Sequence, residues 1–332
     1  MRGKNVMITG ANSGIGKQTG IDLAKMGATI IMIARNKERA FAALEEIKEA
    51  SKSEKIDLFI ADLSDQDSIR SMVKNFKKNY KKLDVLINNA GIMLTKRRST
   101  KEGYEMTLAT NHLGHFLLTS LLLQTLIKSA PARIINVSSV AHKFGNLDFD
   151  DLQLEENFNG LLAYGNSKLA NIMFTYALAR HLEGTGVTVN ALHPGTVKTN
   201  FGKRNESRWS RLFFKFLHLF FSDVKKGAKT SVYLASSPEI EEISGKYFVK
   251  SKLKKSSRAS YDEEVQEKLW TISEKLTHTS YTQLLNEESL IQPTWQKKRK
   301  QIIIRFLIFF FMKLLKEKKY TYIIDLRREM KI

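Results

Sequence analysis

A tyrosine and a lysine stand four residues apart in the stretch YGNSK, as Tyr164 and Lys168. The surrounding residues have helical spacing, and positions i and i+4 of a helix lie on one face, one turn apart. A free phenol has a pKa of ~10, and a neighbouring positive charge stabilises the phenolate and lowers that pKa. A phenol tuned in this way can exchange a proton with an alcohol or a carbonyl near neutral pH. Two amphipathic surface residues would give the same pattern, so the rest of the chain must decide.

Short apolar runs alternate along the chain with longer stretches of helical spacing. The runs predict strands at 5–10, 29–34, 55–63, 83–91, 132–139, 187–195 and 245–249. Between them we expect helices, including a long one over roughly 103–128 and the helix of Tyr164, which runs to about 183. This alternation predicts an α/β fold: a Rossmann-type doubly wound sheet of about seven parallel strands with helices on both faces. Such sheets bind ligands beyond the carboxyl ends of their strands.

The first strand leads into a glycine-rich turn, TGANSGIG, from Thr9 to Gly16. Its glycines let the backbone turn tightly and approach a pyrophosphate, and the next helix offers unpaired N–H groups. The spacing is Gly-x-x-x-Gly-x-Gly, not the more frequent Gly-x-Gly-x-x-Gly, but a place between the first strand and first helix favours dinucleotide binding. The candidate cofactor contacts here are Gly10, Asn12, Ser13, Gly14, Ile15 and Gly16.

Ala34 and Arg35 follow the second strand. An NAD site would place an acidic residue near this position to hold the ribose 2′-OH, whereas an arginine can pair with a 2′-phosphate. A surface arginine at a helix start is the alternative interpretation. We expect NADP(H) to be preferred over NAD(H), with Lys17 and Arg39 as secondary candidates.

The other strand ends also carry small or polar residues. They are Asp62-Leu63 after the third strand, NNAG (88–91) after the fourth, Ser138-Ser139 after the fifth and HPGTVKT (193–199) after the sixth. The carboxyl ends of parallel strands meet at one edge of the sheet, so these residues suit one extended ligand.

The motifs TGANSGIG, NNAG, NVSS, YGNSK and HPGTVKT resemble, in order and spacing, those of the short-chain dehydrogenase/reductase family. The resemblance covers about residues 3–275. The stretches NHLGHFLLT (111–119), NVSSVAH (136–142) and SKLANIMFT (167–175) are similar to the retinol dehydrogenase branch. Members of that branch act on retinoids and on other lipophilic alcohols and aldehydes. The resemblance therefore implies hydride transfer between NADP(H) and a lipophilic alcohol/carbonyl pair.

The resemblance also implies roles for single residues. Tyr164 is expected as the general acid/base, Lys168 lowers its pKa and holds the nicotinamide ribose, and Ser139 binds the substrate oxygen. Asn111 is expected to support a water in the proton relay. Further cofactor contacts are implied at Asp62, Leu63, Asn88, Ala90, Gly91, Pro194, Gly195, Val197 and Thr199. His193, before Pro194, is expected to be structural, and His112 and His115 within the long helix are expected to be packed or partly exposed rather than catalytic. No His/Asp/Glu cluster has metal-ligand spacing.

Two other readings are weaker. A protochlorophyllide reductase-like enzyme shares NHLGHF and Tyr-x-x-x-Lys but depends on cysteine chemistry, and this chain has no cysteine. A non-catalytic NADP(H)-sensing or interaction protein on the same fold would usually lose Tyr164, Lys168 or Ser139, which are all present. The net charge of +20 raises the question of nucleic acid. No basic helix with interleaved aromatic residues supports that partner.

The sequence predicts an enzyme domain over 1–278 and a basic, apolar-centred tail over 279–332. Within the domain, the aromatic run at 200–224 suits a lid over a bulky apolar substrate or a helix on a membrane surface. The apolar centre of 297–319 is too short to span a bilayer, which takes ~20 apolar residues, but suits peripheral membrane contact. With no leader-like start, we expect a cytoplasmic protein with membrane association at these two segments. A homodimer through helix faces is compatible with the family.

Overall fold

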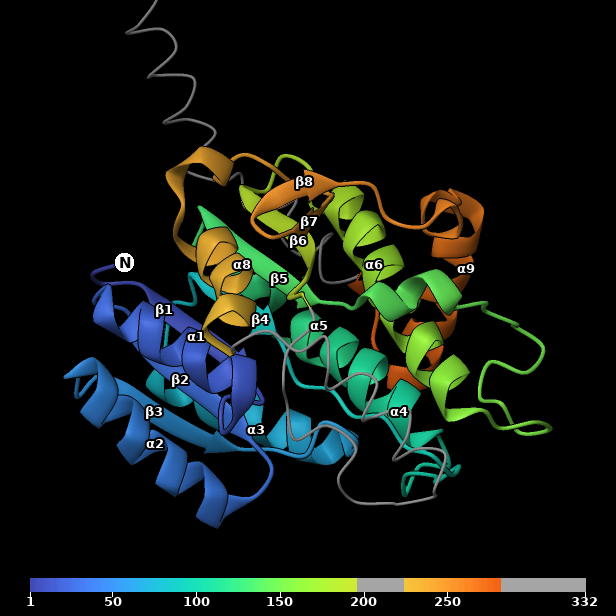
Figure 1. The fold of residues 1–332 in the computed structure, drawn as a ribbon, viewed down its shortest axis with the longest axis horizontal. Coiled ribbons are helices and arrows are strands. Elements are labelled where there is room, and N and C mark those ends of the chain that lie inside the picture. The colour runs from blue at the N-terminus through green and yellow to red at the C-terminus, as the bar shows by residue number, and fades with distance from the viewer. Residues whose placement is uncertain (196–223, 282–332) are drawn as a thin grey trace, which may run out of the picture. The chain divides into compact units, whose positions relative to one another are not determined.

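The computed structural model describes residues 1–195 and 224–281, and its centre is one eight-stranded sheet (Figure 1). The strand order is β3-β2-β1-β4-β5-β6-β7-β8. The strands are β1 (Asn5–Thr9), β2 (Thr29–Ala34), β3 (Ile56–Ile60), β4 (Val85–Asn88), β5 (Ala132–Val137), β6 (Val187–His193), β7 (Lys246–Val249) and β8 (Lys252–Lys254).

The predicted doubly wound fold is confirmed, with one addition. Strands β1 to β7 pair in parallel, and the order reverses between β1 and β4, which is the switch point where such sheets bind ligands. The eighth strand, β8, pairs antiparallel with β7 and was not expected from the sequence. Its three residues are all exposed and carry no apolar pattern, so only the pairing with β7 makes them a strand.

Helices cover both faces of the sheet. They are α1 (Gly14–Lys25), α2 (Lys37–Ser51), α3 (Gln66–Asn79), α4 (Met106–Leu108), α5 (Gly114–Lys128), α6 (Gly160–His181), α8 (Val224–Ser236) and α9 (Glu263–Thr277). Helix α1 packs between α2 and α8, whereas α3 contacts α5 on the other face (Figure 1). Helix α9 packs against α5 and α6, where the rings of Phe116, Phe174, Trp270 and Tyr281 form one cluster.

Local sequence explains where several helices begin. Asn36, Asp65, Asn159 and Asp262 precede α2, α3, α6 and α9, and each accepts a hydrogen bond from a backbone N–H of the first turn. These side chains satisfy amide donors that a helix leaves unpaired at its start. Ser13 precedes α1 but makes no such bond, so the first N–H groups of α1 are not capped by this side chain.

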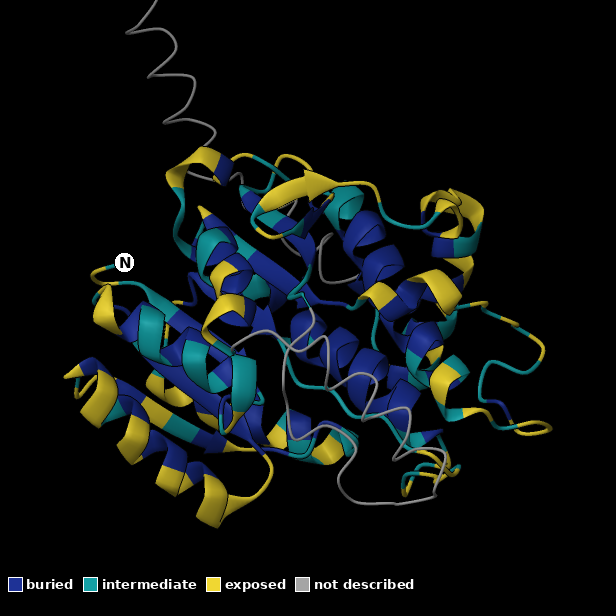
Figure 2. Cartoon of the chain, viewed as in Figure 1, coloured by how far each residue is buried: buried dark blue, intermediate teal, exposed yellow. Residues whose placement is uncertain are grey.

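The core lies between the sheet and the two helix layers (Figure 2). Strand β2 is buried over five of its six residues, as expected for a strand covered on both faces. Ile8, Ile30 and Met32 are fully buried there. Burying one such side chain stabilises the fold by about 1.5–3 kcal/mol.

The long helix expected over 103–128 begins later and is interrupted. Gly103 has a φ of +87°, and Glu105 caps α4 by accepting bonds from Thr107 N and Leu108 N. A π-helical turn over Ala109–Leu113 then precedes α5. Apolar spacing runs on across such a turn, so the sequence pattern does not reveal it, although π turns are frequent at functional sites.

Several predicted features lie outside the described residues. They include Val197, Thr199, the lid at 200–224 except for its last residue, and the tail from residue 282 onward. The chain divides into a compact unit over Met1–Leu284 and a second unit over Leu285–Ile332. Within the described ranges, no helix has both the length and the apolar character needed to cross a membrane.

Candidate active site

Tyr164, Lys168 and Ser139 come together beside the carboxyl ends of β4 and β5. Tyr164 and Lys168 lie one turn apart on α6, with the Lys168 Nζ 5.6 Å from the centre of the Tyr164 ring. Ser139 follows β5 and starts a 3₁₀ turn over Val140–Phe144, and its side chain hydrogen-bonds that of Tyr164. The three residues that the sequence proposed for proton transfer and substrate binding are therefore neighbours.

Gly165, the glycine in YGNSK, allows the 3₁₀ turn after Ser139 to lie close to α6. A Cβ on Gly165 would lie 3.0 Å from the carbonyl oxygen of Ala141 and 3.3 Å from the amide nitrogen of Gly145. The 3₁₀ turn that follows Ser139 thus lies directly against α6 at the position after Tyr164. The distance between Ser139 and Tyr164 depends on this close backbone contact.

Lys168 is enclosed by the protein. Its side chain is buried, and Nζ donates a 3.0 Å hydrogen bond to the carbonyl oxygen of Val137. Burial lowers the pKa of Lys168 to about 8. The end of β5 is also bonded to α6 at this point, because Ser138 Oγ donates a 2.8 Å hydrogen bond to the carbonyl oxygen of Lys168. Ser138 is therefore a buried packing residue, and its side chain does not face a ligand.

The pKa of Tyr164 departs from the sequence expectation. Burial raises the pKa of this half-buried phenol to about 12, and the hydrogen bond with Ser139 opposes the rise. The sequence predicted that Lys168 lowers this pKa, whereas burial, the largest influence on the phenol, raises it. A phenol with this pKa keeps its proton at neutral pH and is suited to give it away as an acid.

Asn111 lies in the π turn and is fully buried. Its Oδ1 accepts from Ile92 N at 2.8 Å, and its Nδ2 donates to Ile92 O and to Ser167 Oγ, both at 2.9 Å. A Cβ on Gly91 would lie 3.3 Å from Lys168 Nζ and 3.4 Å from Asn111 Oδ1. The Asn111 amide therefore ties the segment after β4 to α6, next to Lys168. Any water would have to be held by other atoms of this residue.

The glycine turn fits a dinucleotide pyrophosphate. Gly10 and Gly14 have φ values of +67° and +54°. A Cβ on Gly16 would come within 2.5 Å of both Gly10 O and Asn89 Nδ2. The start of α1 has no acidic residue in its first turn and no side-chain cap from Ser13. An anion there would meet free N–H groups and the positive end of the helix dipole.

Five of the six contacts predicted in this turn are at least partly exposed and so accessible to a ligand: Gly10, Asn12, Ser13, Gly14 and Ile15. The sixth, Gly16, is buried.

Two residues that the sequence did not select join this turn to the NNAG stretch. Thr9 Oγ accepts from the amide nitrogens of Asn89 and Ala90 at 2.8 and 2.9 Å, and Asn89 Nδ2 donates to Thr9 O at 2.8 Å. The side chain of Asn88 instead points inward, where Nδ2 donates to Thr119 Oγ1 and to Asn136 Oδ1. Any contact from Asn88 to a cofactor would therefore come from its backbone. A polar residue at the end of each strand was the signal for Thr9 and Asn89.

Arg35 and Asp62 face each other across the ends of β2 and β3. Arg35 Nη1 lies 3.4 Å from Asp62 Oδ2, and both side chains are accessible, at 54% and 30%. The other carboxylate oxygen of Asp62 accepts from the backbone and side chain of Ser64. An exposed ion pair contributes only about 0–1 kcal/mol, so Arg35 can turn to another anion at little cost. Leu63, next in the chain, is buried.

The end of β6 is only partly described. His193 is the last residue of β6, followed by Pro194 and by Gly195 with a φ of +84°. Burial lowers the pKa of His193 to about 4, so its ring is neutral near pH 7. The side chain is partly exposed, and a packing role for His193 stays a prediction.

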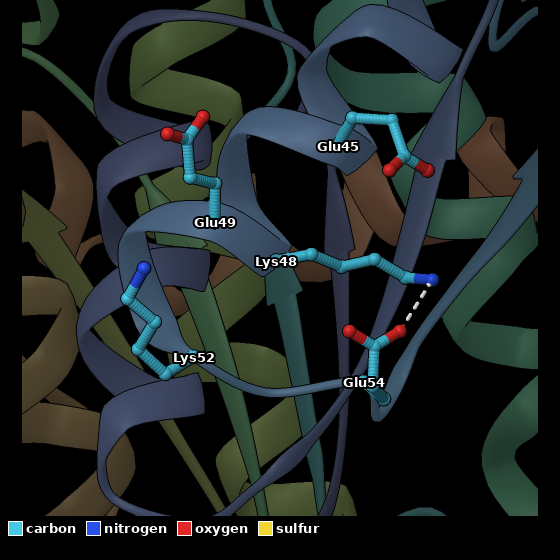
Figure 3. Close-up of a pocket in the computed structure, with 5 residues that line it drawn as sticks. All are labelled: Glu45, Lys48, Glu49, Lys52 and Glu54. Atoms are coloured by element: carbon cyan, nitrogen blue, oxygen red, sulfur yellow. Dashed lines mark ion pairs between the residues drawn. The ribbon is translucent and has the colours of Figure 1, made fainter.

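A surface depression lies elsewhere, at the C-terminal end of α2 (Figure 3). Its lining consists of Glu45, Lys48, Glu49, Lys52 and Glu54. Lys48 Nζ pairs with Glu54 Oε2 at 2.8 Å. Helix α2 runs back from the carboxyl end of β2, so this depression lies at the opposite edge of the sheet from Tyr164. Within the described ranges, no group of three His, Cys, Asp or Glu residues could hold a metal ion.

A doubly wound sheet with a glycine turn at its switch point and an adjacent phenol–ammonium pair defines a dinucleotide-dependent oxidoreductase. Residues 4–209 match the family described as short chain dehydrogenase. The chain belongs to the short-chain dehydrogenase family.

Named relatives and a solved structure agree with this assignment. Retinol dehydrogenase 14 of Homo sapiens is 45% identical over 289 residues, which cover 82% of this chain and 86% of that protein. Retinol dehydrogenase 12 of Mus musculus is 42% identical over 271 residues, covering 82% and 85%. A crystal structure of an uncharacterised Mycobacterium paratuberculosis protein is 33% identical, with a TM-score of 0.69, and covers 84% of this chain and 95% of that one.

Proposed function

We propose that this protein transfers hydride between NADP(H) and a lipophilic alcohol or carbonyl compound, with Tyr164 as the general acid/base. The observation that carries the proposal is the meeting of Tyr164, Ser139 and Lys168 at the sheet edge that also holds the glycine turn. Several relatives are named for retinol, a lipophilic alcohol, which supports the substrate class.

The protein's own residues divide the remaining work. The nicotinamide cofactor supplies the hydride. The Tyr164 hydroxyl gives its proton to the carbonyl oxygen, while the Ser139 hydroxyl donates a hydrogen bond to the same oxygen. Because the pKa of Tyr164 is raised to about 12, the phenol is protonated at neutral pH, which favours carbonyl reduction. Lys168, with a pKa of about 8, is mostly charged near pH 7 and stabilises negative charge on the phenol oxygen.

The NADP(H) preference is proposed from Arg35. Its side chain is accessible at the end of β2 and is engaged only in an exposed pair with Asp62. A 2′-phosphate carries more charge than one carboxylate and can bind the guanidinium through two hydrogen bonds. Arg35 would then leave Asp62 for the phosphate.

Cofactor binding by the full-length protein tests this proposal. NADPH should bind at least tenfold more tightly than NADH, and Arg35→Ala should remove that difference, because a charged bidentate contact contributes about 1.5–3 kcal/mol. Arg258→Ala is the control, because it removes an exposed arginine from the 3₁₀ turn that follows β8, at the opposite end of the sheet from β3. Equal binding of the two cofactors by the wild type would exclude the role of Arg35.

Turnover tests the chemistry separately. Tyr164→Phe should retain NADPH binding and lose about 10³-fold or more in kcat with a lipophilic aldehyde such as retinal. An aldehyde of two or three carbons should be a poorer substrate. Binding without turnover in the wild type, across such aldehydes and ketones, would favour a cofactor-sensing protein instead.

A further inference from the structure

His115 is a buried histidine whose two ring nitrogens are both engaged next to the site. It is the second residue of α5. Its Nε2 is 2.9 Å from Thr9 Oγ, and its Nδ1 is 2.9 Å from the carbonyl oxygen of Asn111. Thr9 is the last residue of β1 and Asn111 lies in the π turn. One imidazole thus joins the start of the glycine turn to the backbone of Asn111.

The contacts determine which nitrogen of His115 carries the proton. Thr9 Oγ already accepts two N–H donors, from Asn89 and Ala90, so both of its lone pairs are used. Its hydroxyl hydrogen can donate to Ile87 O at 3.5 Å or to His115 Nε2 at 2.9 Å, and the shorter contact to His115 is the stronger one. The carbonyl of Asn111 can only accept, so Nδ1 must carry the hydrogen. Both ends require a neutral imidazole protonated on Nδ1.

His142 repeats this arrangement at the catalytic serine. Its Nδ1 lies 2.6 Å from the carbonyl oxygen of Ser139, and its Nε2 accepts from the backbone N–H of Ser257 at 3.0 Å. A carbonyl requires N–H on Nδ1, and an N–H donor requires a bare Nε2. The ring is buried and packs edge-on against Tyr247 of β7 at 5.2 Å between centroids. The backbone of Ser139 is thereby tied to residues 118 positions further along the chain.

Burial supports the neutral state of both rings. It lowers the pKa of His115 to about 3 and lowers the pKa of His142 below its ordinary value. A protonated ring would turn an N–H toward the N–H of Ser257, or toward an oxygen that has no lone pair left on Thr9.

A third buried histidine provides a contrast. His112 Nε2 lies 2.9 Å from Ser273 Oγ, which already donates its hydrogen to Leu269 O. The hydroxyl must therefore accept, and His112 carries its hydrogen on Nε2. This ring contacts α9 and holds no carbonyl of a catalytic-site residue through that nitrogen.

We propose that His115 and His142 are positioning residues that hold the backbone carbonyls of Asn111 and Ser139 through neutral, Nδ1-protonated rings. This inference rests on the proposed function, because it assigns the two histidines to the geometry of that same site. Asn111 ties Ile92 to α6, and Ser139 hydrogen-bonds Tyr164. A shift of either carbonyl would therefore move groups that surround the reacting atoms.

Nitrogen NMR of the histidine-labelled full chain tests the protonation directly. At pH 7, His115 and His142 should show a protonated Nδ1 and a bare Nε2, whereas His112 should show the opposite pattern in the same spectrum. Spectra of the single variants assign the signals among the seven histidines. An Nε2-protonated or charged His115 or His142 would overturn the inference, whether or not any variant folds.

Kinetics of conservative variants tests the positioning. Asparagine places an amide nitrogen near the position of Nδ1, and glutamine places one near Nε2. His115→Asn and His142→Asn should keep kcat within about threefold, while His115→Gln and His142→Gln should lose about tenfold. KM and NADPH affinity should change less than threefold in all four. His181→Gln, on an accessible histidine that stacks on Trp270, is the control.

The outcomes separate this inference from the proposed function. If Tyr164→Phe removes turnover but the asparagine and glutamine variants behave alike, the histidines do not position the site and the proposed function stands. If Tyr164→Phe retains turnover, the proposed function is wrong, and the inference that rests on it is wrong as well. Equal losses in kcat and in thermal stability across all four variants would indicate a packing role only.

Discussion

Gly165 offers a direct test of how the site is assembled. A Cβ at this position would lie 3.0 Å from Ala141 O, and ordinary contact begins at 3.4 Å. Gly165→Ala should therefore push the 3₁₀ turn away from α6 by about 0.4 Å, carrying Ser139 away from Tyr164. A misplacement of 1 Å can reduce the rate by about 10²-fold, so 0.4 Å corresponds to about sixfold in kcat, or about 1 kcal/mol.

Stability should respond differently from turnover. Alanine stabilises a helix interior relative to glycine by about 0.5–1 kcal/mol, and the steric contact at Gly165 should offset that gain. Gly20→Ala in α1 is the matched control, because its Cβ would meet the nearest side-chain atom at 3.5 Å. It should raise stability by about the full helix increment and leave kcat unchanged.

Steady-state kinetics, NADPH binding and thermal unfolding of the two variants complete the test. Gly165→Ala should lose kcat with NADPH affinity unchanged, because the displaced segment holds substrate-side groups. Wild-type kcat in Gly165→Ala would refute the role of this backbone contact. A loss confined to NADPH affinity would refute it as well, since the cofactor side would then have moved.

Three further predictions follow from the same contacts. Asp62→Asn removes the charge that competes for Arg35 and should tighten NADPH relative to NADH by about threefold; an unchanged ratio would argue against the Arg35 contact. Gly16→Ala places a Cβ 2.5 Å from Gly10 O, so NADPH affinity should fall by at least about tenfold while the chain still unfolds cooperatively. The pKa of His115 is about 3 when folded and ~6.5 when unfolded, so the unfolded state alone takes up a proton as pH falls below ~6.5. From pH 7 to pH 5, the free energy of unfolding of the wild type should therefore fall by about 2 kcal/mol more than that of His115→Asn, measured by chemical denaturation. The same fall in both proteins would show that the ring is not held neutral.

The sheet and most of the site could be predicted because parallel strands place their carboxyl ends together. The positions of Gly10, Asp62 and Ser139 at the ends of the first, third and fifth strands followed from that rule alone. Helical spacing placed Tyr164 and Lys168 on one face. These are local patterns, and a sequence displays them directly.

What the sequence could not show depends on side-chain direction and burial. Asn88 and Asn89 are chemically identical neighbours, yet the first points into the core and the second reaches the glycine turn. The raised pKa of Tyr164 did not follow from the sequence, because charge can be read from a sequence but desolvation cannot. The link from His142 to Ser257 joins distant parts of the chain, and no spacing rule predicts it.

The short strand β8 has a consequence for how the protein behaves among other copies of itself. An edge strand exposes unpaired N–H and C=O groups that can recruit another chain's strand. Here the edge is only three residues long, and it carries Lys252 and Lys254, with Lys255 directly after them. A second copy approaching this edge would bring like charges together and find few backbone groups to pair with. The lysine-rich end of the sheet should therefore resist edge-to-edge aggregation, and replacing these lysines with threonine or valine should promote it.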